Sequence, residues 1–481
     1  MSRAPFFLLH AFILAVSSGC IAFATGGGDG DGDGDAGTPA DAGDGDGDGD
    51  GDGDGDGDGD GDGDGDGDGD GDGDCPSLAA ECAAGVYTAC TCAATDPCAW
   101  AGDGLCDATT CATIVATPFN DLGDCTAGDG DGDGDGDGDG DGDQQLTPAL
   151  EGALDTALYQ SGLVSGAPGV GAAVVLSSGD VWVGATGVRN PASQAPVLDD
   201  TTFRVGSVTK PFVAALAMQI VDEGGLSLQT TLATTRPEIQ NAANITIRHL
   251  MNHTSGVVSY TDLDAFWNDV ELDPLAPVTT DDIVSYITTT TALFTPGASW
   301  SYSNSNYVLL GEIVEGETGE ALGASLAQRI AFPLGLTKTS YAPAAPVGAD
   351  LARGISKALT GTDADVTEAY HLSLAGPAGA LVSTPRDIAV FMDALLFDDV
   401  VSATSRDAML NFVPTGTPGM QWGLGIGNFN GALGHDGLIF GYTALVVWVP
   451  DVDAVVAVCA NHDEANLQTV LDALVTALAS N

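Results

Sequence analysis

The sequence predicts a mixed α/β (α+β) fold for residues 148–481, an antiparallel sheet flanked by helices with an α-helical lobe inserted. Near the start of this region, the apolar runs 171–176 and 181–184 flank a Ser-Ser-Gly-Asp turn, which is the pattern of a β-hairpin. Near its end, the apolar runs 445–449 and 454–459 precede a final helical segment. Strands at both ends with helices between them therefore indicate one sheet with a helical insert, and the length suffices for one such unit.

Residues 1–24 have the composition of an export signal. An apolar run at 5–16 follows one arginine, precedes small residues and is too short to span a membrane permanently. Two processing routes fit, because Ala-Phe-Ala at 22–24 suits signal peptidase, whereas Ser-Ser-Gly-Cys ending at Cys20 resembles a bacterial lipobox whose leucine is replaced by serine. We favour lipidation of Cys20, since a long tether follows. The protein is therefore expected to be exported, as a cell-envelope lipoprotein or a secreted protein that meets membrane only through a lipid anchor.

Two segments, 25–74 and 126–147, are predicted to be disordered linkers. Most of each is a strict Gly-Asp alternation. Glycine keeps such a backbone loose, and the aspartates between the glycines repel one another and prevent collapse. The Asp-x-Asp spacing imitates the start of an EF-hand loop, but no glutamate stands at the twelfth position, so we expect no specific calcium site in the linkers.

Residues 75–125, between the linkers, are predicted to form a small disulfide-stapled module. So short an exported segment cannot build an adequate hydrophobic core, and it contains an even number of cysteines. The eight are Cys75, Cys82, Cys90, Cys92, Cys98, Cys106, Cys111 and Cys125. Cys459 lies in an apolar run far from this module and is expected to be a buried free thiol.

The acidic stretches 102–107 and 121–125 of this module partly resemble Lin-12/Notch repeats, which bind calcium. The module differs from that pattern by extra cysteines at its front. The resemblance implies a calcium site, and acidic surface residues between disulfides are the alternative that stays open. The implied ligands are Asp103, Asp107, Asp121 and Asp124.

The strongest chemical signal in the chain is Ser207, followed three residues later by Lys210, one of only three lysines. On a helix this spacing places both side chains on one face, about one turn apart. The apolar run 212–221 predicts a buried helix that begins at the serine and stops at the glycines of 224–225. A buried lysine has a lowered pKa, so its neutral amine could accept the serine proton and make Ser207 a nucleophile.

Five segments resemble motifs of the serine β-lactamase and penicillin-binding superfamily, in the branch of class C β-lactamases, D-Ala-D-Ala carboxypeptidases and related esterases. The resemblance covers about residues 148–480 and keeps the family's motif order. It implies a sheet closed by both chain ends, an inserted helical lobe and an active site between the two. The segments are 203–210, 247–256, 302–304, 379–387 and 435–437.

The resemblance also implies a role for each matched residue. Ser207 would attack the substrate carbonyl, and Lys210 and Tyr302 would share its proton. Asn304 would orient the substrate and the lysine. The backbone N–H groups of Ser207 and Leu438 would form the oxyanion hole. No cofactor is implied for catalysis.

The third motif, His435-Asp436-Gly437, departs from the family where substrate is bound. Class C β-lactamases usually have lysine in place of His435, and a neutral imidazole grips a substrate carboxylate less firmly than an ammonium does. Asp436 replaces a small hydroxyl residue and would raise the histidine pKa or repel an anionic substrate. Asp436 and Gly437 are thus expected at the substrate, and His435 among the catalytic residues.

We therefore expect an exported serine hydrolase that forms an acyl-enzyme on Ser207, acting as an esterase or a D-Ala-D-Ala carboxypeptidase-like enzyme on a small ester or peptide. A β-lactamase acting on a β-lactam is one alternative, disfavoured by His435. Another is a non-catalytic protein whose cysteine-rich module binds a cell-envelope or surface partner, disfavoured by the intact catalytic set. The net charge of −57 argues against nucleic acid as a partner.

Overall fold

The computed structural model describes residues 144–358, 360–398 and 400–481. The predictions for the export signal, Cys20, the linkers, the cysteine-rich module and its calcium ligands lie outside these residues. Within the described part of the chain, no helix is both long enough and apolar enough to cross a membrane.

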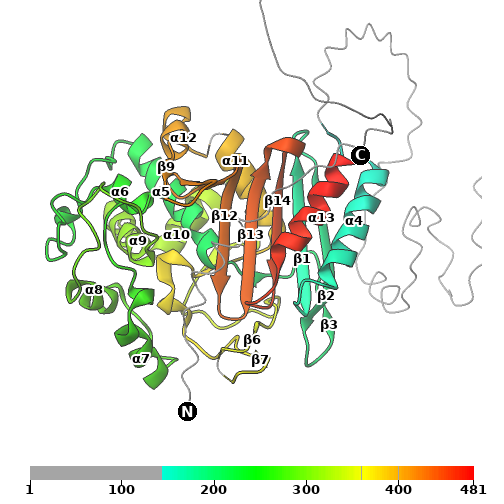
Figure 1. Ribbon diagram of the computed structural model, residues 1–481, viewed down its shortest axis with the longest axis horizontal. Coiled ribbons are helices and arrows are strands. Elements are labelled where there is room, and N and C mark those ends of the chain that lie inside the picture. Colours follow the sequence, from blue (N-terminus) through cyan, green and yellow to red (C-terminus); the bar gives the residue numbers. More distant parts are fainter. Residues whose placement is uncertain (1–143, 359, 399) are drawn as a thin grey trace, which may run out of the picture. The chain divides into compact units, whose positions relative to one another are not determined.

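A nine-stranded antiparallel sheet forms the centre of the described region (Figure 1), in the order β3-β2-β1-β14-β13-β12-β11-β10-β9. The predicted hairpin is confirmed, since β1 and β2 are antiparallel neighbours and Val175 pairs with Val181 beside the turn. The late strands β13 and β14 are confirmed too, and β1 pairs with β14, so the first and last long strands of the described region meet in mid-sheet. The strands are β1 (Gly169–Leu176), β2 (Val181–Asn190), β3 (Ala195–Pro196), β9 (Val413–Pro414), β10 (Met420–Trp422), β11 (Gly427–Phe429), β12 (Ala432–Ile439), β13 (Tyr442–Val449) and β14 (Ala454–Ala460).

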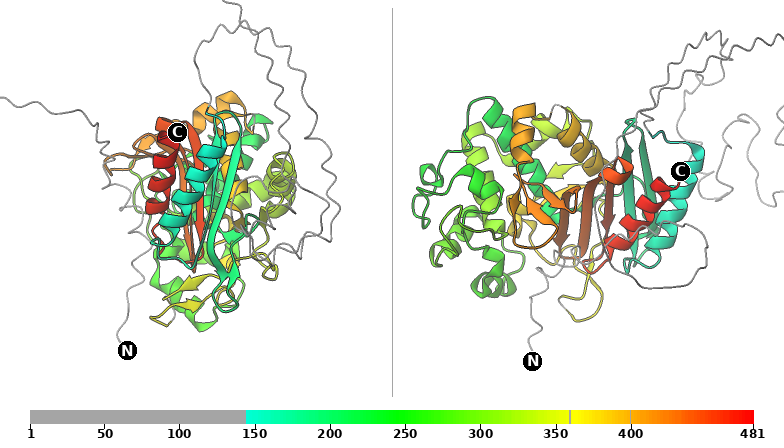
Figure 2. Two further views of the ribbon diagram at one scale, coloured as in Figure 1. Left: turned by 90° about the vertical axis from the view of Figure 1, so that its right-hand side faces the viewer. Right: turned by 45° about the horizontal axis from the view of Figure 1, so that its top comes forward.

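Helices cover both faces of this sheet, which explains why β1 and β14 are apolar at every position and fully buried. On one face α4 (Pro148–Gly162) and α13 (Leu467–Ala479) lie side by side (Figure 2). On the other face α11 (Pro385–Phe397) packs against β1 and β14. Successive side chains of β14 alternate between these two cores, as the pleat of a strand requires. Cys459 faces the α11 side as a buried free thiol, which confirms that prediction.

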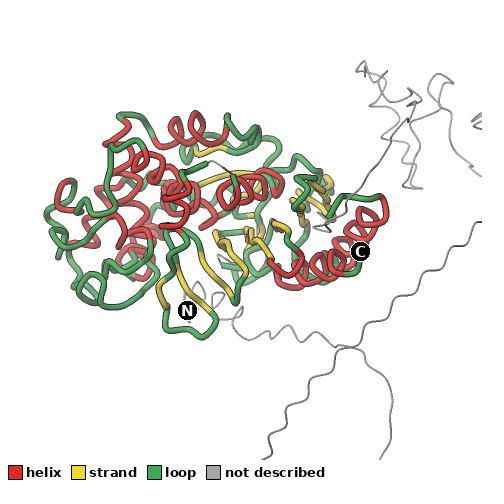
Figure 3. The backbone as a smooth tube through the Cα atoms, turned by 90° about the horizontal axis from the view of Figure 1, so that it is seen from above, coloured by secondary structure: helices red, strands yellow, loops and turns green. Residues whose placement is uncertain are grey.

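The predicted helical lobe is confirmed beside the sheet. Figure 3 shows most of the helices gathered at one end of the described region, away from α4 and α13. Two small sheets, β4-β8-β5 and β6-β7, complete the described region. The remaining helices are α5 (Thr209–Asp222), α6 (Ile247–Met251), α7 (Asp264–Leu272), α8 (Thr280–Thr288), α9 (Asn304–Thr318), α10 (Leu322–Leu326) and α12 (Ala403–Met409). The short strands are β4 (Phe203–Arg204), β5 (Ser340–Tyr341), β6 (Ile355–Ser356), β7 (Ala364–Asp365) and β8 (Leu381–Ser383).

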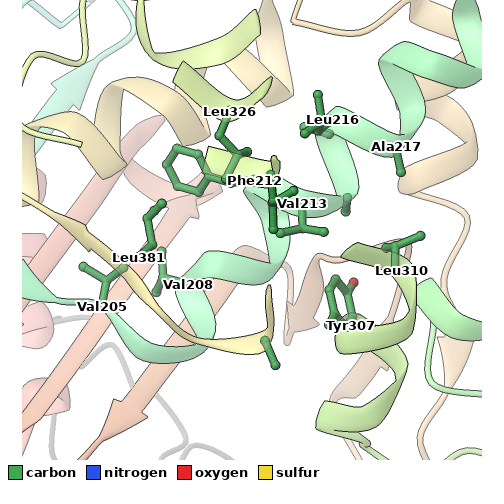
Figure 4. Close-up of a cluster of buried hydrophobic side chains, with 14 of the residues drawn as sticks. Val205, Val208, Phe212, Val213, Leu216, Ala217, Tyr307, Leu310, Leu326 and Leu381 are labelled. Atoms are coloured by element: carbon green, nitrogen blue, oxygen red, sulfur yellow. The ribbon is translucent and has the colours of Figure 1, made fainter. Parts of the chain in front are cut away.

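The helix that carries Lys210 runs through the middle of the core. One 3₁₀ turn, η2 (Gly206–Val208), precedes α5, so Ser207 lies just before the α-helix and not at its first residue. Phe212 on α5 stacks on Phe391 of α11, with ring centroids 3.5 Å apart. Figure 4 shows Phe212 and its apolar neighbours packed between the surrounding elements. This packing fixes the turn that presents Ser207.

Candidate active site

Ser207 and Lys210 meet as their spacing predicts. The Lys210 Nζ lies 2.9 Å from Ser207 Oγ, within hydrogen-bond distance, and donates to the Ala378 carbonyl at 2.7 Å. The lysine is fully buried, and Ser207 is only partly so. A residue of a distant segment, Ala378, thus adds a second hydrogen bond to this amine.

Asn304 and Tyr302 approach the same amine from the helical lobe. Asn304, the first residue of α9, accepts a 2.9 Å hydrogen bond from Lys210 Nζ and donates through Nδ2 to Thr261 Oγ1 at 3.0 Å. Lys210 Nζ lies 4.9 Å from the centre of the Tyr302 ring. The Tyr302 hydroxyl also interacts with the Ser207 side chain. Lys210, Tyr302 and Asn304, all predicted from the sequence, therefore gather around Ser207.

The protonation states follow from burial. Loss of hydration lowers the pKa of Lys210 well below 10.5, although the nearby Asp436 opposes the shift. The same effect raises the pKa of Tyr302 well above 10, against a smaller opposing effect of Ser207. The arrangement thus favours a neutral amine and a neutral phenol, an acceptor and a donor on either side of Ser207.

The third motif lies on β12 and borders the serine through its backbone. Gly206 has a φ of 52°, and a Cβ atom there would lie 2.8 Å from Leu438 N. A Cβ atom on Gly437 would lie 2.0 Å from the Val205 carbonyl oxygen and 3.1 Å from Ser207 N. Only glycine at 206 and 437 permits this approach. The backbone of η2 is therefore held close to that of β12, and Ser207 and Leu438 both line one pocket.

Replacing Gly437 by alanine is expected to separate β12 from η2. The added methyl group has no room against the Val205 carbonyl, so the free energy of unfolding should fall by about 1–3 kcal/mol. Displacement of the Leu438 amide should also lower kcat about 100-fold. Thermal unfolding and ester turnover check both effects.

The matched control is Gly316→Ala. A Cβ atom on this residue of α9 would meet nothing within 4 Å, so the variant should keep full activity and gain stability from helix propensity. Equal behaviour of the two alanine variants would contradict the close approach at Gly437.

His435 and Asp436, neighbours on β12, point to different places. His435 is buried, and its ring lies edge-on to Trp422, with centroids 5.2 Å apart. Burial and Lys210 lower its pKa to about 3, so the imidazole is neutral. It does not line the pocket that contains Ser207, whereas Asp436 and Leu438 do. Asp436 and not His435 is therefore the side chain of the third motif that a substrate would meet.

Comparisons with known proteins agree with this geometry. A family model described as Beta-lactamase matches residues 157–480, more than half of the chain. The chain belongs to the β-lactamase family. The fold and the motif order predicted from the sequence are those of this family, which confirms the resemblance to serine β-lactamases and penicillin-binding proteins.

Relatives of this β-lactamase-family chain have several activities. Penicillin-binding protein 4 of Amycolatopsis lactamdurans is 30% identical over 322 residues, covering 61% of this chain and 81% of that protein. The esterase EstB of Burkholderia gladioli is 30% identical over 215 residues, covering 42% of this chain and 53% of the esterase. Among solved structures, the D-amino acid amidase of Ochrobactrum anthropi SV3 has a TM-score of 0.62 at 26% identity, covering 69% of this chain and 99% of the amidase. The names of these three proteins fit a serine hydrolase, and they do not agree on one substrate.

The pocket beside Ser207 in this β-lactamase-family chain has aromatic walls that sequence reasoning missed. Trp267 of α7 and Phe440, in the turn between β12 and β13, are edge-to-face with centroids 5.8 Å apart. Tyr260 adds a third ring and donates its hydroxyl to the Leu374 carbonyl at 2.6 Å. No spacing signal links these residues, because they come from separate loops and helices.

The role of His253 was also not predicted from the sequence, although its segment resembles a family motif. Its φ is 61°, and its ring lies on Tyr302 with centroids 4.3 Å apart. The Ser303 amide donates to its Nδ1 at 3.1 Å. His253 thereby fixes both the ring and the backbone of the Tyr-x-Asn segment. In the described ranges, no group of three or more His, Cys, Asp or Glu side chains is placed to hold a metal ion.

Proposed function

We propose that this protein is an exported serine hydrolase that forms an acyl-enzyme on Ser207 and cleaves small esters or amides. The observation that carries the proposal is the buried Lys210 amine, 2.9 Å from both Ser207 Oγ and Asn304 Oδ1. A fully buried amine with a lowered pKa is suited to accept a proton. The export part of the proposal rests on the apolar run 5–16.

Acylation follows from these positions. The neutral Lys210 amine takes the Ser207 proton as Oγ attacks the carbonyl carbon, and the amides of Ser207 and Leu438 hold the oxyanion. As the tetrahedral intermediate collapses, Tyr302 gives its proton to the leaving group and recovers one from the Lys210 ammonium. Both side chains then have their starting protonation, and the acyl group remains on Ser207.

Deacylation again uses the Lys210 amine as the base. A water molecule that enters the pocket gives a proton to the neutral Lys210 amine and attacks the acyl carbon. The proton then passes to Ser207 Oγ as the acid leaves, which restores the free enzyme. Tyr302 is the donor in the first half and stays beside Ser207 in the second.

Replacing Tyr302 by phenylalanine is expected to lower kcat about 100-fold or more, because it removes the proton donor to the leaving group. The ring against His253 is kept, so folding should be unaffected. Activated esters, whose leaving groups need no proton, should lose less than amides. An equal loss on p-nitrophenyl esters and on amides would contradict the donor role.

The pocket favours substrates without a carboxylate. Among the described residues, no lysine, arginine or histidine lines it, and Asp436 does. A D-Ala-D-Ala peptide or a β-lactam brings a carboxylate that would meet this acid unpaired. Esters and amides therefore fit better, and relatives named esterase, D-aminopeptidase and D-amino acid amidase support this choice.

Burst release from p-nitrophenyl acetate tests the proposal. The wild-type protein should release p-nitrophenol in a burst that Ser207→Ala lacks. Equal signals from the two proteins would favour the alternative, a non-catalytic protein that binds a surface partner.

Incubation with benzylpenicillin, followed by intact-mass spectrometry, separates the remaining enzyme classes. The proposal expects no adduct. A lasting adduct absent from Ser207→Ala would indicate a D,D-peptidase-like site, and one that forms and clears would indicate a β-lactamase.

A further inference from the structure

The pocket beside Ser207 is acidic. Two carboxylate residues line it, Asp262 and Asp436, and no lysine, arginine or histidine of the described ranges does. The one lysine nearby, Lys210, is buried beneath the surface of the pocket and has a lowered pKa. A ligand therefore meets negative charge on the walls and no fixed positive charge.

Among the described residues, the one ion-pair contact of the Asp436 carboxylate is with His435. His435 Nδ1 lies 3.9 Å from its carboxylate, but that imidazole is neutral and directs Nδ1 to the Asp436 backbone carbonyl, 2.5 Å away. Burial raises the pKa of Asp436, and Lys210 lowers it. The Asp436 side chain keeps 16% of its surface exposed, toward the pocket. A partly buried carboxylate without an ionic partner is costly to fold, unless a ligand supplies the opposite charge.

Aromatic side chains also line this pocket. Trp267, Phe440 and Tyr260 line the same pocket, and the faces of such rings attract ammonium groups. Tyr370 stacks on Phe440 with centroids 4.2 Å apart, which holds that ring in place. A carboxylate and aromatic rings that line one pocket are a combination typical of ammonium recognition.

We propose that the pocket selects esters or amides that carry an ammonium group close to the scissile carbonyl, and that Asp436 is the residue that determines this preference. The inference rests on the proposed hydrolase function and names its substrate class. Asp436 takes no part in proton transfer here. It pairs with the substrate charge from β12, two residues before the oxyanion amide of Leu438.

Two matched substrate pairs test the preference with the full-length protein. Alanine p-nitroanilide, in both enantiomers, is compared with its N-acetyl derivative, and acetylcholine with its uncharged isostere 3,3-dimethylbutyl acetate. The first pair places the charge on the acyl side and the second on the leaving group. At neutral pH, kcat/KM should favour the cation by about tenfold or more in at least one pair, the magnitude of one charge-assisted contact.

Asp436→Asn should abolish this preference, and Asp436→Glu should partly restore it. A second variant, Asp436→Ser, places a small hydroxyl side chain at this position. It takes the place of Asp436→Asn in the experiment if that variant folds poorly. The control is Asp451→Asn, which removes the same charge from an exposed residue outside the pocket and should keep the preference. The measured quantity is the ratio of kcat/KM within each pair, which a general loss of stability does not change.

The outcomes separate the inference from the function on which it rests. Ser207-dependent turnover of p-nitrophenyl acetate without a cation preference in either pair would overturn the inference and leave the hydrolase intact. A preference that survives in Asp436→Asn would overturn the role of Asp436. Absence of any Ser207-dependent turnover would overturn the proposed function, and the inference with it.

Discussion

Lys210→Met is expected to lower kcat/KM about 1,000-fold or more. Methionine fills a similar volume in the core but has no amine, so nothing buried beside Ser207 can accept its proton. The wild-type rate should rise with pH through the lowered pKa of Lys210 and reach its plateau well below pH 10.5, because only the neutral amine is a base. The variant should lose this rise. Initial rates across a pH series measure both effects.

Lys338→Met is the matched control. Lys338 forms salt bridges with Asp200 and Asp350 at the surface and does not line the pocket beside Ser207. This variant should therefore keep the rate and the pH profile. If both methionine variants lost activity equally, or if Lys210→Met kept the rising limb, Lys210 would not be the base.

Ser207→Ala is expected to remove turnover to the limit of detection, a loss of about 10,000-fold or more, because no other hydroxyl can form the acyl-enzyme. The serine is only partly buried and precedes α5 in a single 3₁₀ turn, so the melting temperature should change little. Steady-state ester hydrolysis and thermal unfolding of the same preparation check the two statements.

Ser178→Ala, in the exposed β1–β2 hairpin, is the control for this variant, and its activity should equal that of the wild type. Residual turnover in Ser207→Ala above a few per cent of the wild-type rate would mean that another nucleophile or a bound water does the chemistry.

The part of the site that could be predicted from the sequence is the part with local spacing. Ser207 and Lys210 meet because residues three apart share a helix face, and no distant contact is needed for that. Tyr302 and Asn304 could be predicted only through the family motif, since 94 positions separate Lys210 from Asn304 and no periodicity relates them. The strands could be predicted because apolar runs bounded by turns occur at both ends of the region.

The substrate pocket could not be predicted in the same way. Successive residues of a strand point to opposite faces, and the sequence does not say which of His435 and Asp436 faces the pocket. The structure directs Asp436 toward the pocket and His435 toward Trp422. The aromatic wall arises only when α7 and the β12–β13 turn come together in the fold. Trp422 itself is fully buried.

The central claim, an acyl-enzyme on Ser207, is tested most directly by trapping it. The full-length protein is mixed with p-nitrophenyl butyrate, quenched in acid within the first turnovers, and analysed by intact-mass spectrometry and peptide mapping. The account predicts a single butyryl group on the peptide that contains Ser207, present in the wild type and absent from Ser207→Ala. Turnover without any adduct on that peptide, or an adduct on another residue, would contradict it.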